Sequence, residues 1–152
     1  MKHFWIGAIA LPCWATAGLA QPKTQVRLFE NATVGTQPPA PIVLRGISGG
    51  PAETQAIAGR PETETGPCLG FVDPEPDHRI TLQIPFERLR LQVAATGDTV
   101  LVVRGPGGVW CNDDADDRNP AIGGSWLAGT YEIWVGSYEA GAAFPYLLEI
   151  IP

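Results

Sequence analysis

Apolar and polar residues alternate with a period of two along most of the chain after residue 67. In residues 78–84, for example, Ile80, Leu82 and Ile84 are separated by polar side chains. Successive side chains of a β-strand point to opposite faces, so this period is typical of half-buried strands. Runs of this kind, separated by Gly and Pro turns, occupy residues 78–84, 86–94, 98–104, 130–136 and 146–151. Short strands at this spacing predict an all-β fold, an antiparallel β-sandwich.

The alternation also assigns the strand residues to faces. One set is expected to form the core: Leu101, Val103, Tyr131, Ile133, Val135, Tyr146, Leu148 and Ile150. The opposite set is Val100, Val102, Trp134, Leu147 and Ile151. That second surface is too apolar to be left in water. We expect residues 26–29 and 42–47 to pack over it; the alternative is that it binds a partner.

Residues 21–66 are rich in Pro, Gly, Thr and Ala. Apart from the two short apolar runs at 26–29 and 42–47, the segment consists of turn-forming residues, with one helical turn predicted near residues 51–57. We therefore predict an irregular N-terminal arm with one or two short strands over residues 21–66. The β-sandwich domain is predicted over residues 67–152.

The first twenty residues have the pattern of a secretory signal peptide. Lys2 and His3 precede a nearly uninterrupted apolar stretch, and a small-residue cleavage pattern ends at Ala20. The sequence before Cys13 is a poor lipoprotein signal because a proline precedes the cysteine. We predict cleavage near Ala20, export to the periplasm or the extracellular space, and no membrane attachment of the mature chain.

Charge and cysteine content agree with export. Without residues 1–20 the chain has nine basic and sixteen acidic residues, a net charge of −7. Nucleic acids and anionic membranes bind surfaces with clustered Lys and Arg, so neither is an expected partner. Cys68 and Cys111 then form an even pair, which in an exported chain predicts a disulfide. Free thiols are the alternative, as is half of a zinc site, for which His78 supplies too few further ligands.

The run of residues 110–120 holds four of the sixteen acidic residues. Carboxylate and amide oxygens at a strand end are typical calcium ligands. The candidate Ca²⁺ ligands are Asn112, Asp113, Asp114, Asp116 and Asn119, with help from Asp98, Glu62 or Glu64. The alternative is a turn in which the Asn and Asp side chains bond nearby backbone N–H groups and the remaining carboxylates are solvated.

Catalytic patterns are present but lack their structural context. Residues 46–50 fit G-x-S-x-G around Ser48, and Asp73 and His78 follow in a suitable order. That motif needs a strand–elbow–helix within an α/β sheet, which the all-β pattern does not offer. His78, at a strand start, is expected to be an exposed polar residue. Glu132 with a loop aspartate would make a carboxylate pair for glycoside hydrolysis, but nothing fixes their separation. We expect no catalytic residues.

Aromatic residues concentrate in the C-terminal half. Exposed Trp and Tyr side chains at sandwich loops stack on sugars or anchor protein partners. The candidate binding aromatics are Trp126, Trp134 and Tyr138. Their alternative role is to fill the core or to plug the ends of the sandwich.

A set of ordered motifs runs through residues 98–150. It comprises Asp-Thr-Val-Leu-Val-Val from Asp98, Gly-Pro-Gly-Gly from Gly105, Asn-Asp-Asp from Asn112, Ala-Gly-Thr-Tyr ending at Tyr131 and Tyr-Leu-Leu from Tyr146. This set resembles bacterial pre-peptidase C-terminal domains, over about residues 68–152. The Trp-Cys-Asn-Asp-Asp and Trp-Val-Gly-Ser-Tyr variants also look like small exported bacterial proteins that are common in cyanobacteria.

The resemblance implies a jelly-roll-like β-sandwich with a non-catalytic role. Such domains usually trail secreted peptidases, and some bind calcium or matrix proteins such as collagen. No peptidase precedes the domain in this sequence, so a targeting role is not the expectation. We expect an exported binding or accessory module that contacts a protein, matrix or glycan partner, with Ca²⁺ as the candidate cofactor and a secreted peptidase among the candidate partners. The alternatives are a structural or Ca²⁺-sensing envelope protein and, less favoured, a small secreted hydrolase.

Overall fold

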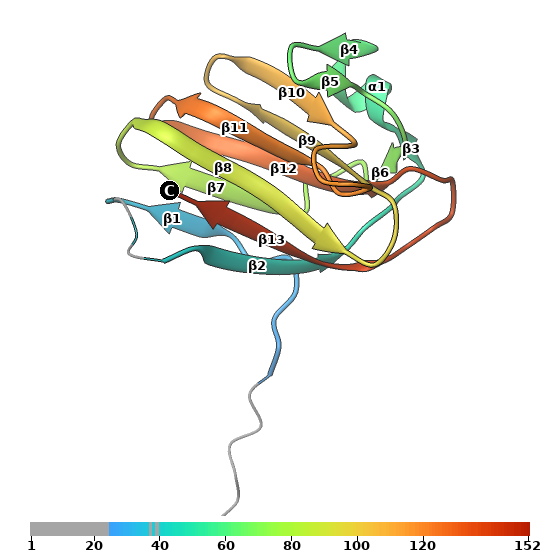
Figure 1. Cartoon of the computed structure of the whole chain (residues 1–152), viewed down its shortest axis with the longest axis horizontal. Coiled ribbons are helices and arrows are strands. Elements are labelled where there is room, and N and C mark those ends of the chain that lie inside the picture. The colour runs from blue at the N-terminus through green and yellow to red at the C-terminus, as the bar shows by residue number, and fades with distance from the viewer. Residues whose placement is uncertain (1–24, 37, 39) are drawn as a thin grey trace, which may run out of the picture.

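The computed structural model describes residues 25–36, 38 and 40–152, so the predicted signal peptide lies outside the described residues. The chain folds into two β-sheets that pack face to face, with a small hairpin and one short helix beside β10 at one side of the molecule (Figure 1). This is the all-β sandwich that the alternation of apolar residues predicts.

The first sheet is built around β12 (Gly129–Ser137). β7 (His78–Leu82) and β9 (Thr99–Gly105) pair antiparallel with its two sides. β1 (Ala32–Val34) extends the sheet beyond β7 and runs parallel to it, whereas β10 (Gly108–Asn112) extends it beyond β9 in an antiparallel hairpin. The parallel β1–β7 pair is the one departure from the predicted antiparallel pattern among the described strands.

The second sheet has four antiparallel strands in the order β11 (Ala121–Trp126), β8 (Phe86–Ala95), β13 (Pro145–Ile151) and β2 (Ile42–Ile47). β2 pairs with β13 over its whole length. Part of the segment predicted as an N-terminal arm is therefore an integral edge strand of the sandwich.

Residues 52–72 form a small insertion between β2 and β7. It contains β3 (Ala52–Glu53), α1 (Thr54–Ala58), the β4 (Glu62–Thr63) and β5 (Gly66–Pro67) hairpin, and β6 (Phe71–Val72). β6 pairs with β3 and with the end of β12, which ties the insertion to the first sheet. The predicted helical turn corresponds to α1, which ends at Gly59 in the left-handed conformation that favours glycine.

The main core lies between the two sheets, and every residue predicted for it is buried there. Side chains such as Leu101, Ile133 and Leu148 have no exposed surface. Burying a side chain of this size stabilises the fold by about 1.5–3 kcal/mol. The alternation therefore located the core correctly.

The outer face of the first sheet is also covered, by the insertion. Val100, Val102 and Trp134 pack into a second cluster with residues of α1, β6 and the disulfide: Ile57, Ala58, Cys68, Val72 and Cys111. The prediction that residues 26–29 and 42–47 cover this face is wrong. β2 belongs to the opposite sheet, and its Leu44 is buried in the main core. Val26, Leu28, Phe29 and Ile47 are exposed. Val26 and Leu28 line a surface pocket with Leu147, a member of the predicted outer set that stays 39% exposed.

β10 and β11 are the edge strands of the two sheets on the same side of the sandwich. They lie next to each other, and Asn112 at the end of β10 links them because its Oδ1 accepts the N–H of Ala121 at 3.0 Å. This side of the molecule carries the chemistry described next.

Candidate functional site

The acidic loop between β10 and β11 is fastened by its two asparagines. Asn119 Oδ1 accepts the N–H of Ala95 and the hydroxyl of Thr99, both at 3.2 Å, and its Nδ2 donates to the C=O of Ala95. Asn112 donates from Nδ2 to the C=O of Thr65 at 2.8 Å and accepts from Ala121. Both amides therefore bond groups distant in sequence and hold the loop in place.

This geometry argues against Asn119 as a calcium ligand and gives Asn112 a fastening role as well. A carboxamide oxygen has two lone pairs, and both lone pairs of Asn119 Oδ1 are engaged in hydrogen bonds. In the part of the chain that the structure describes, no group of three or more Asp, Glu, His or Cys side chains is arranged to hold a metal. The predicted set of five ligands is not brought together.

Three carboxylates of this region influence one another electrostatically: Asp98, Asp113 and Asp114. Burial raises the pKa of Asp98, and the charge of Asp114 raises it further. Burial and the charge of Asp114 likewise raise the pKa of Asp113. Asp116 and Asp117 are exposed, and Asp117 pairs with Arg118 at 3.8 Å. Negative charge therefore concentrates at Asp98, Asp113 and Asp114.

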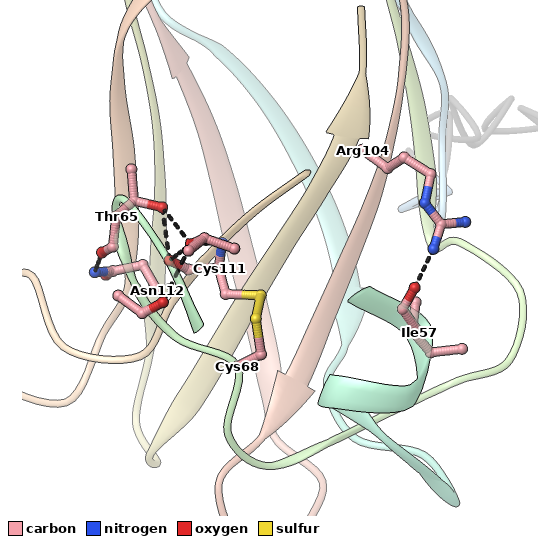
Figure 2. The surroundings of a disulfide bond; sticks show 8 residues. Ile57, Thr65, Cys68, Arg104, Cys111 and Asn112 are labelled. Atoms are coloured by element: carbon pink, nitrogen blue, oxygen red, sulfur yellow. Dashed lines mark hydrogen bonds between the residues drawn. A yellow bond between two sulfur atoms is a disulfide. The ribbon is translucent and has the colours of Figure 1, made fainter. Parts of the chain in front are cut away.

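The predicted disulfide between Cys68 and Cys111 is confirmed. It joins the chain just after β5 to the edge strand β10 (Figure 2). Next to it the hydroxyl of Thr63 accepts the N–H of Cys111 at 2.9 Å, and the hydroxyl of Thr65 donates to its C=O at 2.7 Å. Two threonine hydroxyls thus form hydrogen bonds with the outward N–H and C=O of Cys111, as a neighbouring strand would.

A cavity of about 320 Å³ opens between β10 and β11. Its walls include three aromatic side chains, Trp110, Trp126 and Tyr131, and its rim includes Glu64 of the turn between β4 and β5 and Gly123 of β11. We refer to it as the aromatic cavity. Glu64 is exposed, and the structure records no ion pair for it within the described residues.

Hydrogen bonds inside the protein fix the aromatic side chains of the cavity. Trp126 donates from Nε1 to the C=O of Leu89 at 2.8 Å, and the Tyr131 hydroxyl donates to the C=O of Leu127 at 2.9 Å. The centroid of the Trp126 ring lies 4.9 Å from that of Tyr131 and 6.3 Å from that of Trp110. Because the polar atoms of Trp126 and Tyr131 are already bonded, these rings present apolar surface to the cavity.

The three predicted binding aromatics have different positions. Trp126 is only 7% exposed, but it borders the aromatic cavity. Trp134 is buried in the second cluster, with the Arg104 guanidinium 5.0 Å from its ring centroid, so its predicted role as a binding aromatic is wrong. Tyr138 is 46% exposed and lies outside the lining of the cavity. The alternation of residues 130–136 assigns Trp134 to the outer face of the sheet, but it does not show that α1 covers that face.

Trp110 is a cavity residue that the sequence prediction did not include. The predicted disulfide could have located it. Cys111 faces the insertion, and adjacent side chains of a strand point to opposite faces, so Trp110 must face the interior of the sandwich. Glu64 could not be predicted in this way, since its position depends on how the β4–β5 hairpin docks on β10.

The groups of the G-x-S-x-G pattern are not assembled into a nucleophilic site. The Ser48 hydroxyl lies 2.8 Å from that of Ser137 and accepts the N–H of Phe144. His78 is buried, so its predicted exposure is wrong; its Nδ1 bonds the C=O of Glu30 and its Nε2 bonds the Tyr146 hydroxyl at 2.8 Å. Both groups thus have other partners, because His78 begins β7 of the first sheet and Ser48 follows β2 of the second sheet.

Asp77 is a buried carboxylic acid next to His78. Its Oδ2 accepts the N–H of Val135 at 2.7 Å. Burial raises its pKa to about 7, the backbone hydrogen bond opposes that shift, and the charge of Asp73 adds to it. Burial lowers the pKa of His78, since the charged imidazolium is poorly solvated there. Asp77 directly precedes β7 and His78 begins it, and neither residue lines the aromatic cavity.

Comparison with known proteins gives a relative in sequence and several similar solved structures. No protein-family model matches the chain. An uncharacterised protein of Synechococcus elongatus is 33% identical over 85 residues, which are 53% of this chain and 63% of that protein. The chain thus spans less than two thirds of the length of this relative.

Two solved structures resemble the fold. The pre-peptidase C-terminal domain of a collagenase from Bacillus anthracis aligns with 82% of this chain and 97% of its own, at 12% identity and a TM-score of 0.49. PliG of Aeromonas hydrophila, a periplasmic lysozyme inhibitor of g-type lysozyme, aligns with 80% and 96%, at 15% identity and a TM-score of 0.39. The first belongs to the family whose motifs the sequence resembles. No functional residue is transferred from either.

No helix within the described residues is long and apolar enough to cross a membrane. The disulfide fits an exported protein, because such bonds persist in oxidising compartments.

Proposed function

We propose that the protein is an exported, non-catalytic binding module and that its ligand site is the aromatic cavity between β10 and β11. The observation that carries the proposal is the cavity itself, about 320 Å³ in volume and walled by Trp110, Trp126 and Tyr131. Binding cavities in proteins are of this size and are lined mainly by apolar and aromatic side chains with a few polar groups.

The site is rigid before any ligand arrives. Trp126 and Tyr131 are held by hydrogen bonds to Leu89 and Leu127, and the disulfide holds the hairpin that carries Glu64. A site that is already ordered loses little side-chain entropy on binding. The lining has one carboxylate, Glu64, and no second ionisable acid or base beside it except the tyrosine, which suits binding better than acid–base catalysis.

An NMR titration with indole and p-cresol as small aromatic probes tests this site. The indole N–H signals of Trp110 and Trp126 should shift, and Trp110→Ala should weaken probe binding about tenfold, as truncation of an aromatic anchor does. Tyr138→Ala is the matched control, because it removes an exposed aromatic side chain outside the cavity. Shifts confined to residues away from the cavity, or equal affinities for the wild type and Trp110→Ala, would contradict the proposal.

Export is part of the proposal, with a periplasmic or extracellular location and a mature chain that begins near Gln21. Fractionation of a producing bacterium, followed by N-terminal sequencing, tests it. Recovery of the full-length chain from the cytoplasm with reduced Cys68 and Cys111 would contradict export.

Calcium binding is our second proposal and concerns the acidic loop. Its support is electrostatic: the charge of Asp114 raises the pKa of Asp98 and of Asp113, and a bound cation would relieve this repulsion. The described carboxylates do not form a ready-made metal site, so the loop would have to rearrange around the ion. Millimolar Ca²⁺ should raise the melting temperature of the wild type and should not raise that of Asp114→Asn. Asp117→Asn is the control, because Asp117 already pairs with Arg118. An unchanged wild-type melting temperature would contradict this second proposal.

A further inference from the structure

The backbone of β11 has an open edge at Gly123. The Val93 N–H donates to the C=O of Pro120, and the Ala121 N–H points the other way, to Asn112. Since inward and outward backbone groups alternate along an antiparallel strand, the N–H and C=O of Gly123 point away from β8. Within the described chain, no hydrogen bond to these two groups is recorded.

No side chain blocks this edge. Gly123, Gly124 and Ser125 are exposed and small. The neighbouring edge strand differs, because the hydroxyls of Thr63 and Thr65 occupy the backbone groups of Cys111 on β10. The outward backbone groups of Gly123 on β11 are thus available to a new strand, whereas those of Cys111 on β10 are already bonded.

Gly123 also borders the aromatic cavity. A strand that pairs with β11 directs alternate side chains to the two faces of the second sheet. One of those faces continues the interior of the sandwich, where Trp110 and Trp126 lie. The same added strand can therefore use the backbone of Gly123 and place a large side chain in the cavity.

Acidic groups lie at the Ala121 end of this edge and at the cavity rim, whereas Arg90 of β8 lies beside Gly123 itself. The acidic loop, residues 113–117, reaches β11 from its Ala121 end, and Glu64 lies at the rim of the cavity. Arg118 is the one basic residue of the loop, and it pairs with Asp117. A partner with basic residues at its ends is complementary to this surface.

We propose that an extended, basic peptide segment of a partner protein adds to β11 as a further strand and places a large apolar side chain in the aromatic cavity. This inference rests on the proposed function, because it uses the same cavity. A second copy of the chain fits less well, because its own β11 has Gly and Ser at 123–125 and so offers no large side chain there.

The test uses the oxidised protein and an acetylated, amidated heptapeptide of sequence Lys-Val-Thr-Phe-Thr-Val-Lys, with binding measured by tryptophan fluorescence and by the amide shift of residue 123. Gly123→Pro removes the outward N–H, and proline is tolerated where an edge-strand N–H faces solvent. Gly123→Ala is the matched control: a Cβ there would meet the Arg90 side chain at 3.6 Å, an ordinary contact, and the N–H is kept.

The peptide should bind to the wild type and to Gly123→Ala, and about tenfold more weakly to Gly123→Pro, which loses a backbone hydrogen bond and gains a steric block. When the Phe of an antiparallel peptide faces the cavity, its neighbours face the backbone of Gly123, so a peptide N-methylated at both Thr residues should bind weakly. A peptide with Ala in place of Phe should also bind weakly. Binding of p-cresol should be the same in all three proteins, which separates the cavity from the strand edge.

Each other outcome overturns one of the two proposals. Peptide binding that survives Gly123→Pro but not Trp110→Ala would leave the cavity as a binding site and overturn strand addition. If the wild type binds neither the peptide nor p-cresol, the aromatic cavity is overturned as a binding site as well. A wild-type dimer in analytical ultracentrifugation that Gly123→Pro dissociates would assign the edge to a second copy of the chain.

Discussion

The carboxyl group of Asp77 accepts the backbone N–H of Val135 inside the sandwich, at 2.7 Å, and no basic side chain pairs with it among the described residues. Asp77 is 7% exposed. A negative charge at this position is solvated by little more than that single N–H, which is why the protonated form is favoured up to a pKa of about 7.

The stability of the protein should therefore depend on pH through Asp77. Its pKa rises from 3.8 in the unfolded chain to about 7, so the folded state binds more protons between these pH values. The contribution of Asp77 is most favourable below pH 3.8 and is lost as the pH rises through 7. Relative to the wild type, Asp77→Asn should thus gain about 4 kcal/mol of unfolding free energy between pH 4 and pH 8.

Urea unfolding of both proteins at several pH values between 4 and 8 measures this difference. The opposing contribution of His78, whose lowered pKa makes acid destabilising, is present in both proteins and cancels. Glu75→Gln is the control because it removes an exposed carboxylate of the same loop. Parallel curves for Asp77→Asn and the wild type would show that Asp77 is ionised in the folded state.

Removal of the Asn119 side chain should destabilise the fold. Asn119→Ala breaks three hydrogen bonds, two with the backbone of Ala95 and one with Thr99, and leaves the buried Thr99 hydroxyl without this partner. We expect a loss of about 2–3 kcal/mol in unfolding free energy. Asn119→Asp keeps both acceptor contacts. It should lose less unfolding free energy than Asn119→Ala at low pH, where the new carboxyl group is neutral. Hydrogen exchange at the Ala95 amide gives a local readout; unchanged protection in Asn119→Ala would contradict the expected role.

Loss of the disulfide should lower the stability of the fold and loosen the rim of the aromatic cavity. The two cysteines are 43 residues apart in sequence, so the cross-link contributes about 4 kcal/mol on the chain-entropy model. In Cys68→Ser with Cys111→Ser, hydrogen exchange should increase in β4 and β5. Reduced wild type is the matched comparison and should behave in the same way. Equal melting temperatures for the oxidised wild type and the double variant would contradict this prediction.

Arg104 should hold α1 against the first sheet. Its guanidinium lies over the Trp134 ring, donates to the C=O of Ile57 at the end of α1, and lies 4.0 Å from Glu132. Arg104→Ala should cost about 1–2 kcal/mol and increase exchange in α1, and Arg104→Lys should be intermediate because an ammonium cannot reproduce the planar contact. The control is Arg79→Ala, which removes an exposed ion pair to the same Glu132. Equal effects of the two alanine variants on α1 would assign the effect to charge alone.

The sequence pattern was sufficient to predict the core and the disulfide, because strand periodicity and cysteine pairing depend on local rules. The residues predicted to cover Trp134 were the wrong ones. Any apolar run within residues 21–66 was equally able to pack on it, and the sequence does not show which run does. The roles of Asn112 and Asn119 depend on partners in β8, in the β4–β5 turn and in β11, so ligand chemistry alone did not distinguish fastening from metal binding.

The alternation of apolar and polar residues could not predict the burial of Asp77 and His78, for a similar reason. Polar residues at a strand start are usually exposed, and only the packing of Tyr146 and the segment around Glu30 against β7 removes His78 from water. The aromatic cavity likewise arises where two sheet edges, distant in sequence, come together. Such features are set by tertiary packing, which a single sequence does not specify residue by residue.

The hydroxyl groups of Thr63 and Thr65 have a consequence for the behaviour of the protein at high concentration. An open-ended polymer of β-sandwiches needs two adhesive edges per molecule, so that each copy bonds one neighbour ahead and another behind. By occupying the backbone of Cys111, the two threonines remove one of the adjacent edges from that role. They therefore close one of the routes by which copies with an accessible β11 would join into a fibre.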